Sequence, residues 1–167
     1  AAEMRDRLAE WGVTMTTGTD SEVIAYLLAW APGETWGERT KYLMKSARGA
    51  YSLVLATKDT VVGIRDPHGL RPLCIGRYPT GGWIIASESA ALDHIGAQFV
   101  REVEPGETVV VDRNGLVSVP SPVPNERVAH CVFEHIYFAR PDSVLDGQLT
   151  HLSRSRMGMA LAKEHPV

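Results

Sequence analysis

The chain has 167 residues, of which 44% are hydrophobic and 22% are charged, with a net charge of −3. This length suits one domain that can bury a core, and the apolar fraction excludes a disordered chain. The slightly acidic balance gives no electrostatic case for binding nucleic acid or an anionic membrane, and no apolar run approaches the roughly 20 residues that span a bilayer. Two cysteines are too few for a disulfide framework, so we expect a cytoplasmic protein.

Both ends of the chain are unusual for a complete domain. A predicted helix starts at Ala1 with neither an initiator Met nor a capping residue before it, and the sequence stops one residue after Pro166. The length alone suggests one whole domain. The ends instead predict a piece of a longer protein.

Three helices are predicted in the first third of the chain. In residues 1–11, the spacing of Met4, Leu8 and Trp11 places them on one helix face, and Gly12 can end that helix. A second helix follows the polar residues 16–19, and a third covers about residues 34–47. The apolar residues of the second helix are Val23, Ile24, Leu27, Leu28 and Trp30.

The middle of the chain then changes to the two-residue period of strands. Consecutive hairpins, the last of which contains Asn114-Gly115, predict antiparallel sheets and an α+β fold. The predicted strand pairs are residues 50–57 with 60–65, 73–76 with 83–87, and 107–112 with 116–119. The other predicted segments are a short helix over 88–95, a proline-rich connector over 120–125 and a final helix over 148–164.

The two cysteines have different surroundings in the sequence. Cys74 lies in an apolar run, which is typical of a buried, unreactive thiol. Cys131 precedes His135 by four residues, a spacing that could supply half of a zinc site on a helix. An ordinary core or surface thiol is the alternative for Cys131.

Asp20 stands at the predicted start of the second helix. Asp20 or Thr19 could cap this helix by accepting its free backbone N–H groups. Alternatively, a carboxylate at the edge of a pocket could bind the ammonium group of a substrate.

Residues 65–73 form a loop whose shape is restricted by two prolines. Gly69 can adopt a positive φ, and Arg65, Asp66 and Arg71 could form a fixed set of ion pairs. The loop is either a structural corner or a rigid platform that presents an arginine to a ligand carboxylate. Arg140 and Asp142 flank Pro141 in a second corner with the same two interpretations.

Several of these segments together resemble class II glutamine amidotransferase domains and, within them, the amidophosphoribosyltransferase family. The resemblance covers essentially the whole chain in order. It rests on residues 19–23, 48–53, 65–73, 86–89, 101–107 and 133–143, of which FEHIYFARPDS (133–143) is the most specific.

The resemblance implies a fold and a reaction. The fold is an N-terminal-nucleophile hydrolase sandwich, αββα with antiparallel sheets. It is incomplete here and is followed by the start of a C-terminal phosphoribosyltransferase domain. Residues 1–127 would be the C-terminal part of the amidotransferase domain, and residues 128–167 a connecting segment and the first transferase helix. The family converts phosphoribosyl pyrophosphate and glutamine to 5-phosphoribosylamine, glutamate and pyrophosphate, the first step of de novo purine biosynthesis.

The resemblance also assigns roles to individual residues. Asp20 matches the aspartate that receives the glutamine α-ammonium group, whereas the nucleophilic cysteine would lie upstream, so no catalytic residue is expected in this chain. Arg65, Asp66, Gly69 and Arg71 match a structural loop near the site. Cys131 matches a position that ligates a 4Fe-4S cluster in some members.

The same resemblance implies cofactors and partners. Mg²⁺ would be bound by the transferase part, the small-molecule substrates would be glutamine and phosphoribosyl pyrophosphate, and the full enzyme would be a homo-oligomer. We expect this chain alone to be inactive. The alternatives are a truncated non-catalytic fragment or another class II amidotransferase, such as glucosamine-6-phosphate synthase, which should lack the segment 133–143.

Overall fold

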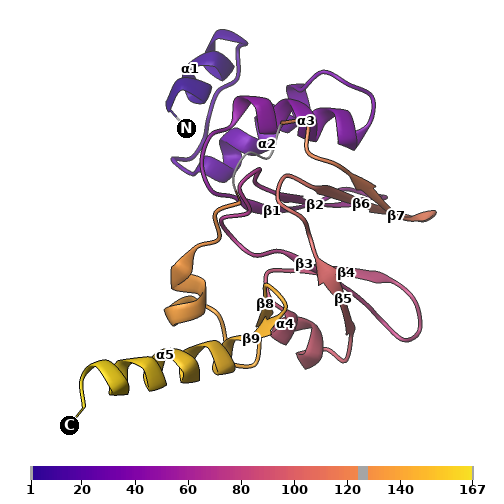
Figure 1. The fold of residues 1–167 in the computed structure, drawn as a ribbon. Coiled ribbons are helices and arrows are strands. Elements are labelled where there is room, and N and C mark those ends of the chain that lie inside the picture. The colour runs from indigo at the N-terminus through magenta and orange to yellow at the C-terminus, as the bar shows by residue number, and fades with distance from the viewer. Residues whose placement is uncertain (1, 124–127, 167) are drawn as a thin grey trace.

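Two antiparallel sheets lie face to face between helices in the computed structural model, which describes residues 2–123 and 128–166 (Figure 1). One sheet is covered on its outer side by two helices, and the other by a short helix. This succession of helix, sheet, sheet and helix layers is the sandwich that the family resemblance implies, and the antiparallel sheets are those predicted from the hairpins.

The first sheet has four strands in the order β1-β2-β6-β7. These strands are β1 (Ser52–Ala56), β2 (Val61–Arg65), β6 (Thr108–Asp112) and β7 (Gly115–Val119). The β1–β2 and β6–β7 pairs are two of the predicted hairpins, and β2 joins them by pairing with β6.

The second sheet has three strands in the order β4-β3-β5. These strands are β3 (Cys74–Arg77), β4 (Trp83–Ala86) and β5 (Gln98–Glu102). The β3–β4 hairpin was predicted, but the sequence analysis missed β5. Helix α4 lies between β5 and its partner β3 in the sequence, so no short turn joins the two strands and indicates a hairpin. The register of this pair shifts between Ile75 and Gly76.

Three groups of buried apolar side chains fill the three spaces between the layers. Leu27, Leu43 and Ile64 belong to the group between the helices and the first sheet. Ile75 and Val109 belong to the group between the two sheets. Cys74 and Leu92 belong to the group beneath the second sheet. β2 contributes Val62 and Ile64 to the group beneath the helices.

Gly63 allows the two sheets to approach closely. A Cβ atom at this position would lie 2.8 Å from a methyl carbon of Val109 and 3.1 Å from Ile85 on the opposite sheet. A side chain here would force neighbouring groups apart, because interiors are packed to crystal-like density.

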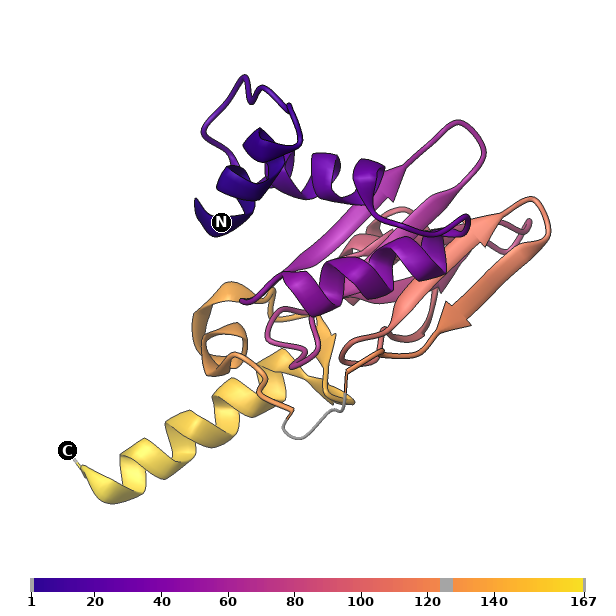
Figure 2. The same cartoon turned by 90° about the horizontal axis from the view of Figure 1, so that it is seen from above.

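The helices α2 (Asp20–Trp30) and α3 (Trp36–Ser46) cover the outer side of the first sheet, and α1 (Ala2–Glu10) packs against α2 farther from the sheet (Figure 2). The predicted apolar face of the second helix is confirmed for Val23, Leu27 and Leu28, which are buried. It is wrong for Trp30, which is 57% exposed and stacks on Trp11 at 6.4 Å between ring centroids.

The C-terminal segment packs below the second sheet and then leaves the sandwich (Figure 1). The short helix α4 (Ser89–His94), which was predicted over 88–95, covers that sheet. The following elements are the π-helix η1 (Glu134–Phe138), the short strands β8 (Val144–Leu145) and β9 (Gln148–Leu149), and α5 (Thr150–Glu164). Only Thr150 of α5 is buried.

Two predictions at this end of the chain have different outcomes. The final helix is confirmed, although it begins at Thr150 because Gln148 and Leu149 pair with β8. The predicted connector falls partly on Pro124 and Asn125, which lie outside the described residues. The π-helix was not predicted by any pattern in the sequence.

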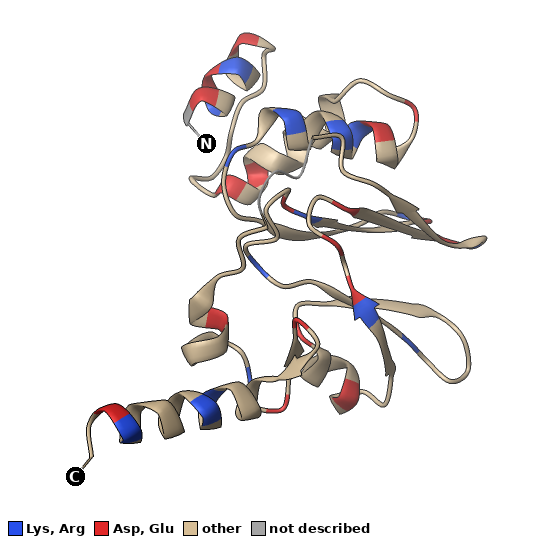
Figure 3. Cartoon of the chain, in the orientation of Figure 1, with Lys and Arg blue, Asp and Glu red and all other residues tan. Residues whose placement is uncertain are grey.

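Charges of both signs are interspersed over the outer helices, whereas the strands carry few (Figure 3). None of the described helices is both long and apolar enough to cross a membrane.

A buried carboxylate joins the start of β6 to its neighbours. Glu107 is 4% exposed, and it accepts hydrogen bonds from the Arg101 guanidinium at 2.7 Å, from Ser118 and from the backbone N–H of Glu104. Burial alone would raise the pKa of Glu107, but these hydrogen bonds outweigh it and lower the pKa.

This lowered pKa predicts a pH dependence of stability. The contribution of Glu107 is present above its ordinary value of 4.5 and is lost as the pH falls through the lowered pKa. We therefore expect a Glu107→Gln variant to be less stable at neutral pH and to lose less additional stability on acidification than the wild type. Urea denaturation at a series of pH values measures this difference. Equal slopes for the two proteins below pH 4.5 would contradict it.

Candidate functional site

A cleft of about 650 Å³ opens where the start of α2 meets the beginning of β1 and the π-helix. Its walls come from segments far apart in the sequence. They include Asp20 and Ser21 from the start of α2, together with Arg71, Glu134 and Phe138.

Asp20 lines this cleft, and its carboxylate is not used to cap the helix. The sequence allowed Asp20 or Thr19 to cap α2, but neither side chain does so, and Asp20 is the first residue of the helix. No hydrogen bond or ion pair of the Asp20 side chain is found within the described part of the chain. An exposed, unpaired carboxylate beside a cleft is suited to binding an ammonium group.

Two further polar groups of the cleft wall are buried. Tyr51 is 9% exposed, and its hydroxyl has no hydrogen-bond partner among the described residues. Burial raises the pKa of Tyr51, and the charge of Asp66 adds to this effect. Burial likewise raises the pKa of Glu134, although the guanidinium of Arg71 opposes the rise.

Arg71 is held at the cleft by two contacts. Its Nη1 lies 2.9 Å from Oε1 of Glu134, and its guanidinium carbon lies 5.1 Å from the ring centroid of Phe138. The charge of Arg71 is therefore already balanced, which favours the structural corner over the alternative of an arginine presented to a ligand carboxylate.

The loop 65–73 is a structural corner built around Asp66. This carboxylate is fully buried and accepts hydrogen bonds from the backbone N–H groups of His68 at 2.9 Å and Leu70 at 3.0 Å. Gly69 has φ +66°, and a Cβ atom there would lie 2.7 Å from Pro105. The positive φ predicted for Gly69 is confirmed.

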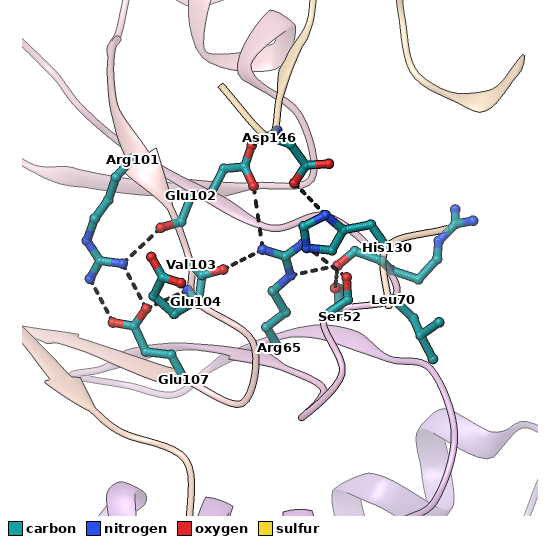
Figure 4. A network of polar contacts seen from close by, with 12 residues as sticks. Ser52, Arg65, Leu70, Arg101, Glu102, Val103, Glu104, Glu107, His130 and Asp146 are labelled. Carbon is teal, nitrogen blue, oxygen red and sulfur yellow. Dashed lines mark hydrogen bonds and ion pairs between the residues drawn. The ribbon is translucent and has the colours of Figure 1, made fainter. Parts of the chain in front are cut away.

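Arg65 ties this loop to the second sheet (Figure 4). Arg65 is 3% exposed. Its guanidinium donates hydrogen bonds to the backbone carbonyls of Arg71 at 3.0 Å, Val103 at 2.6 Å and Gly69 at 3.1 Å. Its Nη1 also lies 3.6 Å from Glu102.

The network continues from Glu102 into the C-terminal segment (Figure 4). The backbone N–H of Asp146 donates to Glu102 at 2.7 Å. The Asp146 carboxylate in turn contacts His130 at 2.6 Å and His135 at 3.0 Å.

The predicted set of ion pairs within the loop is therefore wrong. Arg65 pairs with Glu102 and Arg71 pairs with Glu134, while Asp66 is occupied by backbone N–H groups. In the second corner, Arg140 does pair with Asp142 at 3.0 Å, but both side chains are exposed.

Glu88 and Ser89, at the start of α4, hold the C-terminal segment through their side chains. Glu88 accepts from the backbone N–H of Arg140 at 2.8 Å and from the Ser143 hydroxyl at 2.7 Å. Ser89 accepts from the backbone N–H of Val144 at 2.8 Å.

Neither cysteine belongs to a complete metal site in the described residues. Cys74 is buried in β3, and burial raises its pKa to about 12, which agrees with the predicted unreactive thiol. Cys131 lies with His130, His135 and Asp146 beside a narrow space of about 10 Å³. No three His, Cys, Asp or Glu side chains are placed to hold a metal ion in the parts of the chain that the structure describes.

The architecture defines the class of protein. A sandwich of two antiparallel sheets between helix layers is the N-terminal-nucleophile hydrolase fold, and two solved structures share it with this chain. One, described as the allosteric regulatory enzyme of purine biosynthesis, superimposes with a TM-score of 0.88 and 35% identity over 100% of this chain and 36% of its own. The other, glutamine phosphoribosylpyrophosphate amidotransferase from B. subtilis complexed with ADP and GMP, has a TM-score of 0.87 and 34% identity over 99% of this chain and 36% of its own.

The sequence comparisons identify the family within this class. The profile of the glutamine amidotransferase domain matches residues 1–94, so the chain belongs to the glutamine amidotransferase domain family. The amidophosphoribosyltransferases of Rattus norvegicus and Homo sapiens are 41% and 40% identical to it over the whole chain. That of Synechocystis sp. is 46% identical over 99% of the chain. The chain spans 37% of the length of the two mammalian relatives and 34% of the third.

Sequence reasoning singled out Asp20 and Arg71 but missed Tyr51 and Glu134, which line the same cleft. Tyr51 and Glu134 are brought to the cleft by the β1 strand start and the π-helix, which lie more than 80 residues apart in the printed sequence. The only available signal was that both residues belong to segments that resemble the family.

Proposed function

We propose that this chain is the glutamine-binding part of an amidophosphoribosyltransferase. In the overall reaction, water replaces the amide nitrogen of glutamine to give glutamate and ammonia. The ammonia then displaces pyrophosphate from C1 of phosphoribosyl pyrophosphate to give 5-phosphoribosylamine. The observation that carries the proposal is the unpaired carboxylate of Asp20 beside the cleft, in a chain whose relatives are amidophosphoribosyltransferases.

Asp20 is proposed to bind the α-ammonium group of glutamine. A charge-assisted hydrogen bond to this group would fix one end of the substrate at the start of α2 and leave the amide free to reach deeper into the site. Arg65, Asp66, Gly69 and Arg71 are proposed to keep the facing wall rigid, since their hydrogen bonds and ion pairs join the loop to both sheets.

The described residues do not supply the nucleophile for this reaction. Covalent acyl transfer needs an accessible thiolate or an activated hydroxyl. Cys74 is buried and has a raised pKa of about 12, and Cys131 lies outside the cleft that contains Asp20.

We therefore predict that the 167-residue chain by itself does not hydrolyse glutamine. Glutamate release from glutamine, measured with the purified chain and with a protein of the relatives' length that contains this sequence, tests this prediction. Glutamate release by the 167-residue chain above the rate without protein would contradict it.

The described residues of this chain do not supply a complete set of ligands for the 4Fe-4S cluster or the Mg²⁺ ion that the family implies. A 4Fe-4S cluster needs four cysteine ligands and the chain has two cysteines, so Cys131, which is half-buried, could supply at most one ligand. Mg²⁺ would belong to the transferase part. No step of the proposed mechanism is derived through either group.

The division of the chain into residues 1–127 and 128–167 is also a proposal. It is supported by the separate hairpin and helix of the second segment, β8, β9 and α5. The two segments are joined by hydrogen bonds from Ala129 N–H to His68 at 2.9 Å and from Cys131 N–H to Leu70 at 3.2 Å. A cytoplasmic homo-oligomer remains our proposal for the assembled enzyme.

The activity is tested in a protein of the relatives' length that contains this sequence. We expect pyrophosphate release from phosphoribosyl pyrophosphate with either glutamine or ammonium chloride as the nitrogen source. Glutamine-dependent amination of a different phosphosugar, without release of pyrophosphate, would instead indicate another class II amidotransferase.

A further inference from the structure

The segment that carries Asp20 is fixed by a single carboxylate. Glu22 accepts four hydrogen bonds from the two threonines that precede the helix. Its Oε1 accepts from the backbone N–H of Thr16 at 2.8 Å and from the Thr16 hydroxyl at 2.7 Å. Its Oε2 accepts from the backbone N–H of Thr17 at 2.7 Å and from the Thr17 hydroxyl at 2.6 Å.

Arg5 fixes the same segment from α1. Its guanidinium donates to the backbone carbonyl of Thr17 at 3.1 Å and to that of Thr19 at 2.7 Å. Residues 16–19 are thus held between a carboxylate on one helix and a guanidinium on another, immediately before Asp20.

This arrangement also explains why Thr19 does not cap α2. The Thr19 hydroxyl lies 2.9 Å from the hydroxyl of Thr17, and the Thr19 N–H donates to that same oxygen at 3.3 Å. The loop is therefore ordered by Glu22, Arg5 and its own threonines, and the first turn of α2 does not draw on the Asp20 side chain.

We propose that Glu22 is a positioning residue for glutamine binding, which sets the place of the Asp20 carboxylate through its four hydrogen bonds to Thr16 and Thr17. This inference rests on the proposed function of Asp20. Glu22 does not line the cleft, so it would act on the substrate only through the backbone that leads to Asp20.

Glu22 stays ionised at any pH at which the enzyme would work. The hydrogen bond from the Thr17 hydroxyl and those from Thr16 lower its pKa to about 2. The positioning of Asp20 should therefore not vary with pH in the neutral range, and a charge-removing substitution is needed to reveal it.

The next helix offers a matched control. Glu38 occupies the same kind of position at the start of α3, where its Oε2 accepts from the N–H groups of Glu34 at 2.9 Å and Thr35 at 3.0 Å and from the Thr35 hydroxyl at 3.0 Å. Hydrogen bonds from Thr35 lower the pKa of Glu38 as well. Glu38 does not line the cleft with Asp20.

The test compares Glu22→Gln with Glu38→Gln in a protein of the relatives' length that contains this sequence. We expect Glu22→Gln to raise the KM for glutamine about tenfold, the effect of weakening one charged hydrogen bond. The kcat at saturating glutamine and the ammonia-dependent activity should stay unchanged. Glu38→Gln should leave both the KM and kcat unchanged.

The outcomes separate this inference from the proposed function. The positioning role of Glu22 would be overturned by an unchanged KM in Glu22→Gln or by an equal rise of KM in Glu38→Gln. If Asp20→Ala raises the KM in the same experiment, the proposed function of Asp20 still stands. An unchanged KM in Asp20→Ala would overturn the proposed function itself. If Glu22→Gln fails to fold, Arg5→Met replaces it, because Arg5 holds the same backbone from the other side and the same rise in KM is expected.

Discussion

Replacing Asp20 with alanine should raise the KM for glutamine roughly 10- to 100-fold, the range expected for loss of a charged hydrogen bond to a substrate. The carboxylate lies at the edge of the cleft and makes no contact that holds the described fold together. Ammonia does not carry the α-ammonium group of glutamine, so synthesis with ammonium chloride should continue at the wild-type rate.

An Asp20→Asn variant sharpens this experiment. It keeps the shape of the side chain and its place at the first position of α2, but it removes the charge. We expect it to resemble the alanine variant in KM and the wild type in melting temperature. Equal loss of the glutamine- and ammonia-dependent activities in both variants would reject the role of Asp20 in binding glutamine.

Replacing Arg65 with methionine should destabilise the protein by about 3–5 kcal/mol, as expected when one partner of a buried charge network is removed. The Arg65 side chain is 4% exposed and satisfies three backbone carbonyls as well as facing Glu102. Methionine can fill part of the space but leaves these acceptors without donors. The free energy of unfolding, taken from urea titrations, measures the loss.

Arg140→Met is the matched control for this substitution. Arg140 also pairs with a carboxylate, but its side chain is 70% exposed and that of Asp142 is 57% exposed. Water screens such a pair, so we expect no measurable change in stability. Similar destabilisation by the two variants would show that the buried network around Arg65 has no special importance.

The sequence was sufficient to predict the local elements of the fold. The hairpins β1–β2, β3–β4 and β6–β7 each join strands that are adjacent in the chain, and turn residues separate them. The strand β5 was missed because β4 and α4 separate it from its partner β3 in the sequence. In addition, Phe99 and Val100 are both partly exposed, so buried and exposed side chains do not alternate along the strand. Pairing between distant segments leaves no local period to detect.

The helix starts show a similar limit. A polar residue before an apolar run predicts a cap, and Thr35 forms a full capping box with Glu38 at the start of α3. The equivalent Thr19 does not cap α2, because Thr17 and Arg5 engage its hydroxyl and carbonyl groups. The contact from Arg5 comes from 14 residues away and could not be predicted from the local pattern.

The candidate site was predictable only in part. The resemblance to class II amidotransferases pointed to Asp20, and the structure places it beside a cleft with its carboxylate unpaired. The partners of Arg65 and Arg71 were predicted wrongly because they are decided by packing. Val103 lies 38 residues from Arg65, and Glu134 reaches Arg71 from the π-helix. The charges of one loop need not pair with one another when other segments bury them.

The most direct test of the proposed function follows the amide nitrogen of glutamine. A protein of the relatives' length that contains this sequence is supplied with phosphoribosyl pyrophosphate and with glutamine labelled with ¹⁵N at the amide, and the products are analysed by mass spectrometry. Our account predicts that the label appears in 5-phosphoribosylamine together with one pyrophosphate released per glutamate formed. Glutamate formed without labelled phosphoribosylamine and without pyrophosphate would contradict it.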